Sequence, residues 1–198
     1  MQLIPRFIRH DLSGAPAHRP VFTTAAALAL ALAVPGAVQA QGVSLEGAAG
    51  PTITDRGYSV GGGVGLSPTS RLTFVFAVER SHLATRRDEF PGGVSQFRGG
   101  TFTLGTAALQ VSVLGRHRVS PYGLVGFGAG RSVPNVTPDF PTASETSVRA
   151  PFAGGGLRVP FGEHAAFFTD LRLMLVVGTE ADDLYALAPW RAGLSWTF

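Results

Sequence analysis

The last eight residues, RAGLSWTF (residues 191–198), decide the fold. Together with the residue before them they place an apolar side chain at every second position, at Trp190, Ala192, Leu194, Trp196 and Phe198. This period of two predicts a β-strand with one apolar face. Terminal residues fray unless something holds them. A strand that runs to the last residue therefore predicts a neighbouring strand that pairs with it.

The composition excludes several classes of protein. Hydrophobic residues make up 45% of the chain and charged residues 15%, whereas about a quarter of a typical soluble domain is charged. No cysteine is present, which excludes disulfides, thiolate chemistry and zinc ribbons. From residue 41 onward, the chain contains 13 Arg and 12 Asp plus Glu residues. No basic stripe remains, so we expect no nucleic-acid partner.

Residues 1–40 have the three parts of a secretory signal peptide. Arg6, Arg9 and Arg19 lie in a basic leader, and residues 21–34 form an uncharged apolar run. A Pro-Gly pair and small residues follow, with cleavage expected after Ala40. The apolar run is shorter than the ~20 residues of a membrane-spanning helix. The sequence thus predicts an exported mature domain over residues 41–198.

The mature part alternates with a period of two and shows no helical period. The clearest strands are predicted at 71–80, 168–177 and the C-terminal stretch, and weaker ones at 43–50, 57–66, 101–114, 119–130 and 148–160. In 101–114 the apolar phase of Phe102 and Leu104 differs from that of Val111. A β-bulge between Gly105 and Ala108 is expected to reconcile the two phases.

The connections between these strands alternate between long and short. The short ones are polar turns at 67–70, 115–118 and 161–164, and the long ones lie at 51–56, 81–97, 131–147 and 178–188. In an antiparallel meander this order places all long loops at one end and both termini at the other. Long loops at one end and tight turns at the other are typical of transmembrane β-barrels.

The polar face of the strands holds few charges. They are Glu46, Glu79, Arg158, Asp170, Arg172 and Arg191. A soluble exterior holds far more charge, so this face is predicted to line a narrow interior in which the acids and bases form ion pairs. The apolar face then meets lipid, with Trp190 and Trp196 expected in interfacial girdles at opposite ends of the last strand. The predicted fold is an all-β, eight-stranded antiparallel up-and-down transmembrane β-barrel.

The C-terminal pattern Arg191-x-Gly193-x-x-Trp196-x-Phe198 resembles the terminal signal of bacterial outer-membrane β-barrels. The rest of residues 41–198 resembles the small eight-stranded barrels of the OmpA/OmpX type. The resemblance implies that the outer-membrane barrel assembly machinery recognises this strand. It also implies a monomer in the bacterial outer membrane, in contact with membrane lipid and lipopolysaccharide.

The expected function is structural or surface-interactive, without an open pore. Arg86 and Arg87 in the long loop 81–97 are candidates for contact with anionic lipopolysaccharide. No cofactor is expected, and no metal site, because no His has a second His or a carboxylate at a metal-ligand spacing on one strand. No catalytic residue is expected either, because Ser81 and His82 are adjacent rather than spaced as a nucleophile and base. Two alternatives stay open: an outer-membrane enzyme that modifies lipid A, and a soluble ligand-carrying β-barrel.

Overall fold

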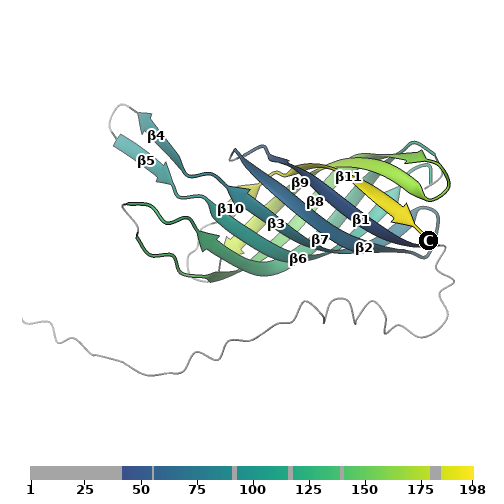
Figure 1. The fold of residues 1–198 in the computed structure, drawn as a ribbon, viewed down its shortest axis with the longest axis horizontal. Coiled ribbons are helices and arrows are strands. Elements are labelled where there is room, and N and C mark those ends of the chain that lie inside the picture. Colours follow the sequence, from purple (N-terminus) through teal and green to yellow (C-terminus); the bar gives the residue numbers. More distant parts are fainter. Residues whose placement is uncertain (1–41, 55, 91–92, 116–117, 139–140, 179–183) are drawn as a thin grey trace, which may run out of the picture. The chain divides into compact units, whose positions relative to one another are not determined.

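The computed structural model describes residues 42–198, apart from 55, 91–92, 116–117, 139–140 and 179–183 (Figure 1). The chain divides into two units, residues 1–36 and 37–198. The expected signal peptide over residues 1–40 lies outside the described residues. The second unit is a closed antiparallel barrel of eight strands, as the sequence predicts.

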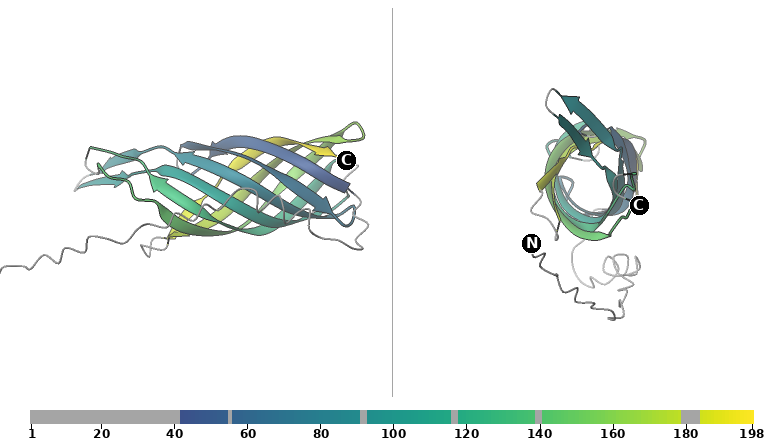
Figure 2. Two further views of the ribbon diagram at one scale, coloured as in Figure 1. Left: turned by 60° about the horizontal axis from the view of Figure 1, so that its bottom comes forward. Right: turned by 90° about the vertical axis from the view of Figure 1, so that its left-hand side faces the viewer.

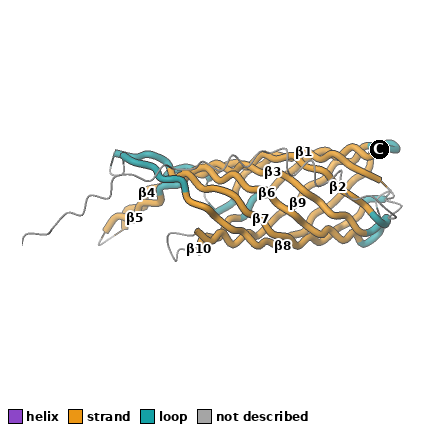
Figure 3. Tube along the Cα trace, turned by 90° about the horizontal axis from the view of Figure 1, so that it is seen from below, coloured by secondary structure: helices purple, strands orange, loops and turns teal. Residues whose placement is uncertain are grey.

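Most of the wall is built from seven continuous strands. They are β1 (Gly42–Thr52), β2 (Gly57–Ser67), β3 (Leu72–Leu83), β6 (Gly100–Ser112), β7 (Ser120–Pro134), β8 (Thr146–Phe161) and β9 (Ala165–Gly178). Each pairs with its neighbours in chain order, and the strands tilt markedly against the barrel axis (Figures 1 and 3). The end-on view shows the closed ring (Figure 2).

The eighth strand consists of two pieces, β10 (Leu184–Leu187) and β11 (Trp190–Thr197). Both pair with β9 in one register, with Leu187 opposite Met174 and Trp190 opposite Leu171. Pro189 interrupts the strand because proline has no N–H to donate to the ladder. Its carbonyl still accepts a hydrogen bond from the Arg172 backbone N–H at 3.1 Å. β11 then pairs with β1 and closes the barrel.

The two ends of the barrel differ as the sequence predicts. The turns at 68–71, 113–119 and 162–164 lie at the end that also holds the C-terminus, here called the turn end. The longer connections lie at the opposite end, here called the loop end. The first of them is shorter than expected, because β1 and β2 extend until only residues 53–56 join them.

A hairpin lies in the segment 81–97, which the sequence predicted as a long loop. β4 (Arg86–Phe90) pairs with β5 (Gly93–Phe97) as a separate two-stranded sheet. It projects beyond the wall at the loop end (Figures 1 and 2). The alternation in this segment is obscured by four consecutive charged residues, so period-two reasoning misses it.

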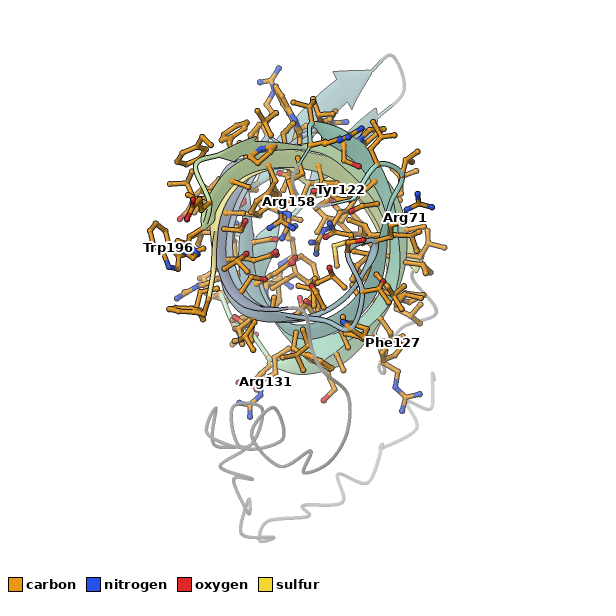
Figure 4. All side chains as sticks on the ribbon, turned by 90° about the vertical axis from the view of Figure 1, so that its right-hand side faces the viewer. Arg71, Tyr122, Phe127, Arg131, Arg158 and Trp196 are labelled. Atoms are coloured by element: carbon orange, nitrogen blue, oxygen red, sulfur yellow. The ribbon has the colours of Figure 1, made fainter. Side chains whose placement is uncertain are left out.

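The apolar side chains face outward. Phe74, Phe76 and Val78 of β3 are exposed, while Thr73, Val75 and Glu79 between them are buried. On β9, likewise, Leu171, Leu173 and Leu175 are exposed, whereas the alternating Asp170, Arg172 and Met174 are buried. In the end-on stick view, Arg158 and Tyr122 point into the barrel, and Phe127 and Trp196 point away from it (Figure 4). The inside-out pattern of a membrane barrel is therefore present.

At the loop end Tyr58, the second residue of β2, is exposed, and the expected aromatic girdle is present at the turn end. Trp196, Phe161 and Phe198 are exposed there at strand termini. Trp190 pairs with Leu171 in the middle of β9, because the eighth strand continues past it to Leu184. Trp190 is the first residue of β11, as expected, but it lies in the middle of the wall, because β10 continues the same register on β9 beyond Pro189.

The expected bulge between Gly105 and Ala108 is also wrong. β6 pairs with β3 without a register break from Leu72–Val111 to Leu83–Gly100. Its pairing with β7 is equally continuous. Leu104 points inward and is 2% exposed, whereas Val111 points outward. The apolar phase changes because the interior itself becomes apolar near the loop end.

An apolar cluster fills the loop-end part of the interior, here called the apolar plug. Its members are Leu83, Leu104, Val148, Ala150, Phe152, Met174, Val176 and Leu187, with Phe102 and Tyr185 packed against them. Tyr122, Leu124 and Phe168 belong to the same buried cluster but lie in the turn-end halves of β7 and β9. Leu83 and Val148 lie at the loop ends of their strands. Phe102 and Tyr185 stack at 6.1 Å between ring centroids. The plug therefore separates the middle of the barrel from the loop end.

Candidate functional site

A charged cluster occupies the interior below the apolar plug. Arg191 of β11 donates from Nη1 to Glu79 Oε1 at 2.6 Å, from Nη2 to Asp170 Oδ2 at 2.7 Å and from Nε to Asp170 Oδ1 at 2.9 Å. The side chains involved are at most 6% exposed. Hydrogen bonds between ionised partners are stronger than neutral ones. Arg191 thus links β3, β9 and β11 across the lumen.

Arg172 joins the same cluster from β9. Its Nη1 donates to Glu79 Oε1 at 2.5 Å, and its Nε donates to Asp170 Oδ1 at 3.2 Å. The guanidinium lies 5.2 Å from the centroid of the Phe152 ring, within the range of a cation–π contact. The cluster therefore touches the apolar plug directly at Phe152.

Tyr122 is a member of the cluster that the sequence reasoning missed. Its hydroxyl donates to Asp170 Oδ2 at 3.2 Å, and the side chain is buried. A lone tyrosine in a glycine-rich strand gives no signal of its own. The available signal was its place in the alternation of β7, which puts it on the face that lines the interior. Gly156 of β8 leaves it room, since a Cβ there would come 2.8 Å from Tyr122 Cζ.

A second ion pair lies nearer the turn end. Arg158 Nη2 of β8 is 3.5 Å from Glu46 Oε1 of β1, and it also donates to the Ser195 hydroxyl. The structure thus places the six charged residues named from the sequence in two groups. They comprise three acids and three arginines, so the interior is formally neutral. Neutrality matters because an uncompensated buried charge is costly.

The open space beside the charged cluster is small. A cavity lined by Glu46, Arg172 and Arg191, among others, measures about 10 Å³, roughly the volume that admits one water molecule. A hollow of about 490 Å³ lies at the seam of β1 and β11, lined by the outward-facing Leu45, Leu194 and Trp196, among others. It lies on the apolar outer wall, whereas a soluble carrier holds its ligand inside the barrel.

The residues of the C-terminal pattern occupy distinct positions. Arg191 is in the charged cluster, and Gly193 faces inward where a Cβ would come 2.7 Å from Phe168 Cζ. Trp196 points outward and stacks on His164 at 5.8 Å between ring centroids. The Phe198 N–H donates to the Val43 carbonyl at 2.9 Å. The final residue therefore belongs to the ladder that closes the barrel.

Two long loops are joined at the loop end. Arg98 Nη2 donates to the carbonyls of Asn135 at 3.2 Å and Thr142 at 3.0 Å. Asn135 Nδ2 donates to the Leu83 carbonyl at 3.0 Å and to Thr85 Oγ1 at 3.2 Å. These bonds connect the β3–β6 and β7–β8 connections into one platform, here called the loop platform. The loop platform could not be predicted from the sequence pattern.

Arg86 is exposed at the start of β4, and Arg87 follows it in the same strand, with its side chain outside the described part. Ser81 points into the barrel and is 5% exposed. His82 lies on the outer face, 5.6 Å from the Tyr58 ring and 3.3 Å from Thr101 Oγ1. Adjacent residues of a strand face opposite sides, so Ser81 and His82 cannot act as a nucleophile and base.

The described residues contain no group of three or more His, Cys, Asp and Glu side chains able to hold a metal ion. Nor does this part of the chain include a helix long and apolar enough to cross a membrane.

The fold matches solved outer-membrane barrels. The N-terminal β-barrel domain of Pseudomonas aeruginosa OprF aligns at a TM-score of 0.57 with 15% sequence identity, over 80% of this chain and 98% of that one. Neisserial surface protein A aligns at 0.57 with 12% identity, over 79% and 95%. The chain has the fold of small eight-stranded outer-membrane barrels. No family model matches it, and no curated protein matches it in sequence.

Proposed function

We propose that this protein is a small integral barrel of the bacterial outer membrane with a structural or surface-interaction role. The observation that supports it is the inside-out distribution of side chains. Large apolar residues such as Leu173, Val125 and Leu194 are 58–64% exposed on the wall, while two acids and three arginines are buried and the third acid, Glu46, is 13% exposed. Water disfavours the first arrangement, and a lipid bilayer favours it.

The interior indicates a closed barrel rather than a pore. The apolar plug fills one end, and the charged cluster with its small cavity fills the middle. Eight strands give an interior that side chains can fill. The role is therefore assigned to the outer wall and the loop end, where the loop platform presents the β4–β5 hairpin on a rigid base. Binding residues favour loops positioned by a rigid scaffold.

Three partners belong to this proposal. The outer-membrane assembly machinery recognises the C-terminal strand through Arg191, Gly193, Trp196 and Phe198. The protein acts as a monomer surrounded by lipid. Lipopolysaccharide contacts Arg86 and Arg87 on the projecting hairpin, because guanidinium groups pair well with phosphate. Replacing both arginines with Ala is expected to lower lipopolysaccharide affinity, and unchanged affinity excludes this contact.

The test of the proposed function is electrophoresis of outer-membrane fractions, unboiled against boiled, for the full chain, a Phe198 deletion and Phe198→Tyr. A closed membrane barrel stays compact in detergent until heated, so the two lanes should differ. We expect the deletion to lose the shift, because β11 loses its last ladder bond, and the aromatic replacement to keep it. Recovery of the full chain as a soluble periplasmic protein without a shift contradicts the proposal.

The proposed role is not enzymatic. Ser81 faces the interior and His82 faces outward, which supports a role without catalysis. Lipid A from cells with and without the protein, compared by mass, provides the test. Identical masses are expected, and a change in acyl or phosphate content that depends on the protein would replace this role with a lipid-modifying activity.

A further inference from the structure

Three arginines face outward near the loop end, on strands β3, β7 and β8 of the run β3-β6-β7-β8. They are Arg80 of β3, Arg131 of β7 and Arg149 of β8, and all three are exposed. Arg80 pairs with Thr103 of β6, which in turn pairs with Arg131. Neighbouring strands lie 4.7–4.9 Å apart, which places the Arg80 and Arg131 backbones about 10 Å from each other. Two arginine side chains can reach a common anion over that distance.

Arg149 extends the group to β8. It pairs with Ala129, two residues before Arg131 on β7, and is therefore a diagonal neighbour of Arg131 at about 7–8 Å. Figure 4 shows Arg131 on the outside of the barrel. We call Arg80, Arg131 and Arg149 the arginine patch.

The arginine patch has an excess of positive charge. Arg131 pairs with Glu145 at 2.8 Å, and both side chains are about half exposed. Among the described residues, no carboxylate pairs with Arg80 or Arg149. An exposed ion pair such as Arg131–Glu145 contributes little, so the guanidinium of Arg131 remains available to a stronger anionic partner.

The outward-facing residues around these arginines on β6 and β7 are small. Thr103 and Gly105 lie on β6, between Arg80 of β3 and Arg131 of β7, and Ala129 lies on β7 between Gly105 and Arg149. A Cβ at Gly105 would meet only the Ala129 carbonyl, at 3.8 Å. A headgroup can therefore approach the backbone of β6 and β7 without displacing a large side chain.

The wall directly toward the turn end is apolar. Phe76 of β3 pairs with Ala107 of β6, which pairs with Phe127 of β7. Phe76 is 41% and Phe127 49% exposed. The arginine patch thus borders the apolar band, where the polar headgroups of a bilayer meet its acyl chains. An anionic lipid fits both parts at once, with its chains against Phe76 and Phe127 and its phosphate at the arginines.

We propose that the arginine patch is a binding site on the barrel wall for the phosphate-bearing headgroup of an outer-leaflet membrane lipid. This site is separate from Arg86 and Arg87, and it rests on the proposed insertion in the outer membrane. Arginine suits the role, because its planar guanidinium forms paired, charge-assisted hydrogen bonds with phosphate.

The test uses the purified full chain in detergent and native mass spectrometry with diphosphoryl lipid A as the probe. The double variant Arg80→Gln with Arg149→Gln removes the two arginines that lack a described carboxylate. The matched control is Arg71→Gln with Arg118→Gln, because these arginines are exposed at the turn end. We expect the patch variant to bind lipid A about tenfold more weakly, from lost charge-assisted contacts, and the control to bind as the original chain does.

A second measurement needs no variant. Dephosphorylated lipid A should bind the original chain about tenfold more weakly than the diphosphoryl form, and millimolar inorganic phosphate should not displace the lipid. Equal binding of both lipids, or equal binding by the patch and control variants, overturns the proposal. Full displacement by free phosphate overturns the assignment to a lipid. A heat shift that persists in every variant shows that such a failure concerns the patch alone and leaves the membrane barrel intact.

Discussion

Arg191 Nη1 lies 2.6 Å from Glu79 Oε1, although the two residues are 112 positions apart in the chain. The contact crosses the lumen from β11 to β3, so it links strands that are not neighbours in the wall. Arg172 reaches the same Glu79 oxygen from β9. Glu79 is therefore the acceptor that joins two buried arginines, and its removal leaves both without part of their compensation.

Glu79→Gln should lower the free energy of unfolding by about 3–5 kcal/mol, because it leaves buried positive charge uncompensated. Urea unfolding in detergent micelles, followed by tryptophan fluorescence, measures the change. Glu145→Gln is the matched control. Glu145 lies 2.8 Å from its partner Arg131, and both side chains are about half exposed. The expected loss in the free energy of unfolding is therefore only about 0–1 kcal/mol. Equal losses in the two variants would contradict the structural role of the charged cluster.

Gly156→Val should destabilise the barrel by about 1–3 kcal/mol through overpacking. A Cβ at Gly156 would come 2.8 Å from both Asp170 Cβ and Tyr122 Cζ. Gly123→Val is the control on the outer face, since a Cβ there meets nothing within 4 Å. The urea midpoint of each variant checks the expectation. A larger loss at Gly123 than at Gly156 would reverse the assignment of inside and outside on β7 and β8.

Val125→Arg should cost about 2–4 kcal/mol in lipid, as a charge on the lipid-facing wall of a membrane barrel does. Val125 is 58% exposed on β7. Val136→Arg provides the comparison in a loop, where the same residue type is 63% exposed, and it should leave stability unchanged. Folding into lipid vesicles from urea gives both values. If Val125→Arg is tolerated as well as Val136→Arg, water rather than lipid surrounds the wall.

Arg98→Ala should loosen the loop platform without unfolding the barrel. It removes the bonds to the carbonyls of Asn135 and Thr142, so the two loops lose their connection. Limited proteolysis of the folded protein should cut the segments 84–99 and 135–145 faster, while the heat shift is retained. Arg118→Ala at the turn end is the control. Unchanged proteolysis in Arg98→Ala would show that the hairpin does not depend on this support.

Much of the wall could be predicted from the sequence because alternation fixes which residues share a face. Leu171, Leu173 and Leu175 oppose Asp170 and Arg172 in the structure as they do in the pattern. The six interior charges could also be predicted, because few charged residues stand at the alternate positions that face the interior. Their contacts were not, since the pairing of Glu79 with Arg191 depends on how the sheet closes.

The wrongly predicted bulge has a physical cause. Alternation separates apolar from polar residues, but it cannot distinguish an apolar residue that faces lipid from one in the apolar plug. Leu104 and Val111 are both apolar, yet Leu104 points inward and Val111 outward. A change in interior polarity then looks like a change in register. The position of Trp190 in the wall was also predicted wrongly. The alternation breaks at Pro189, but the pairing with β9 continues beyond it.

The balance of three acids and three arginines also constrains how this barrel can diverge. The six side chains come from β1, β3, β8, β9 and β11, so no single segment contains a complete set of partners. A substitution that removes one charge becomes acceptable only when a partner, in most cases on another strand, loses the opposite charge. Descendants of this chain should therefore exchange these residues in correlated pairs, and a recombinant that joins strands from two lineages should inherit a mismatched interior.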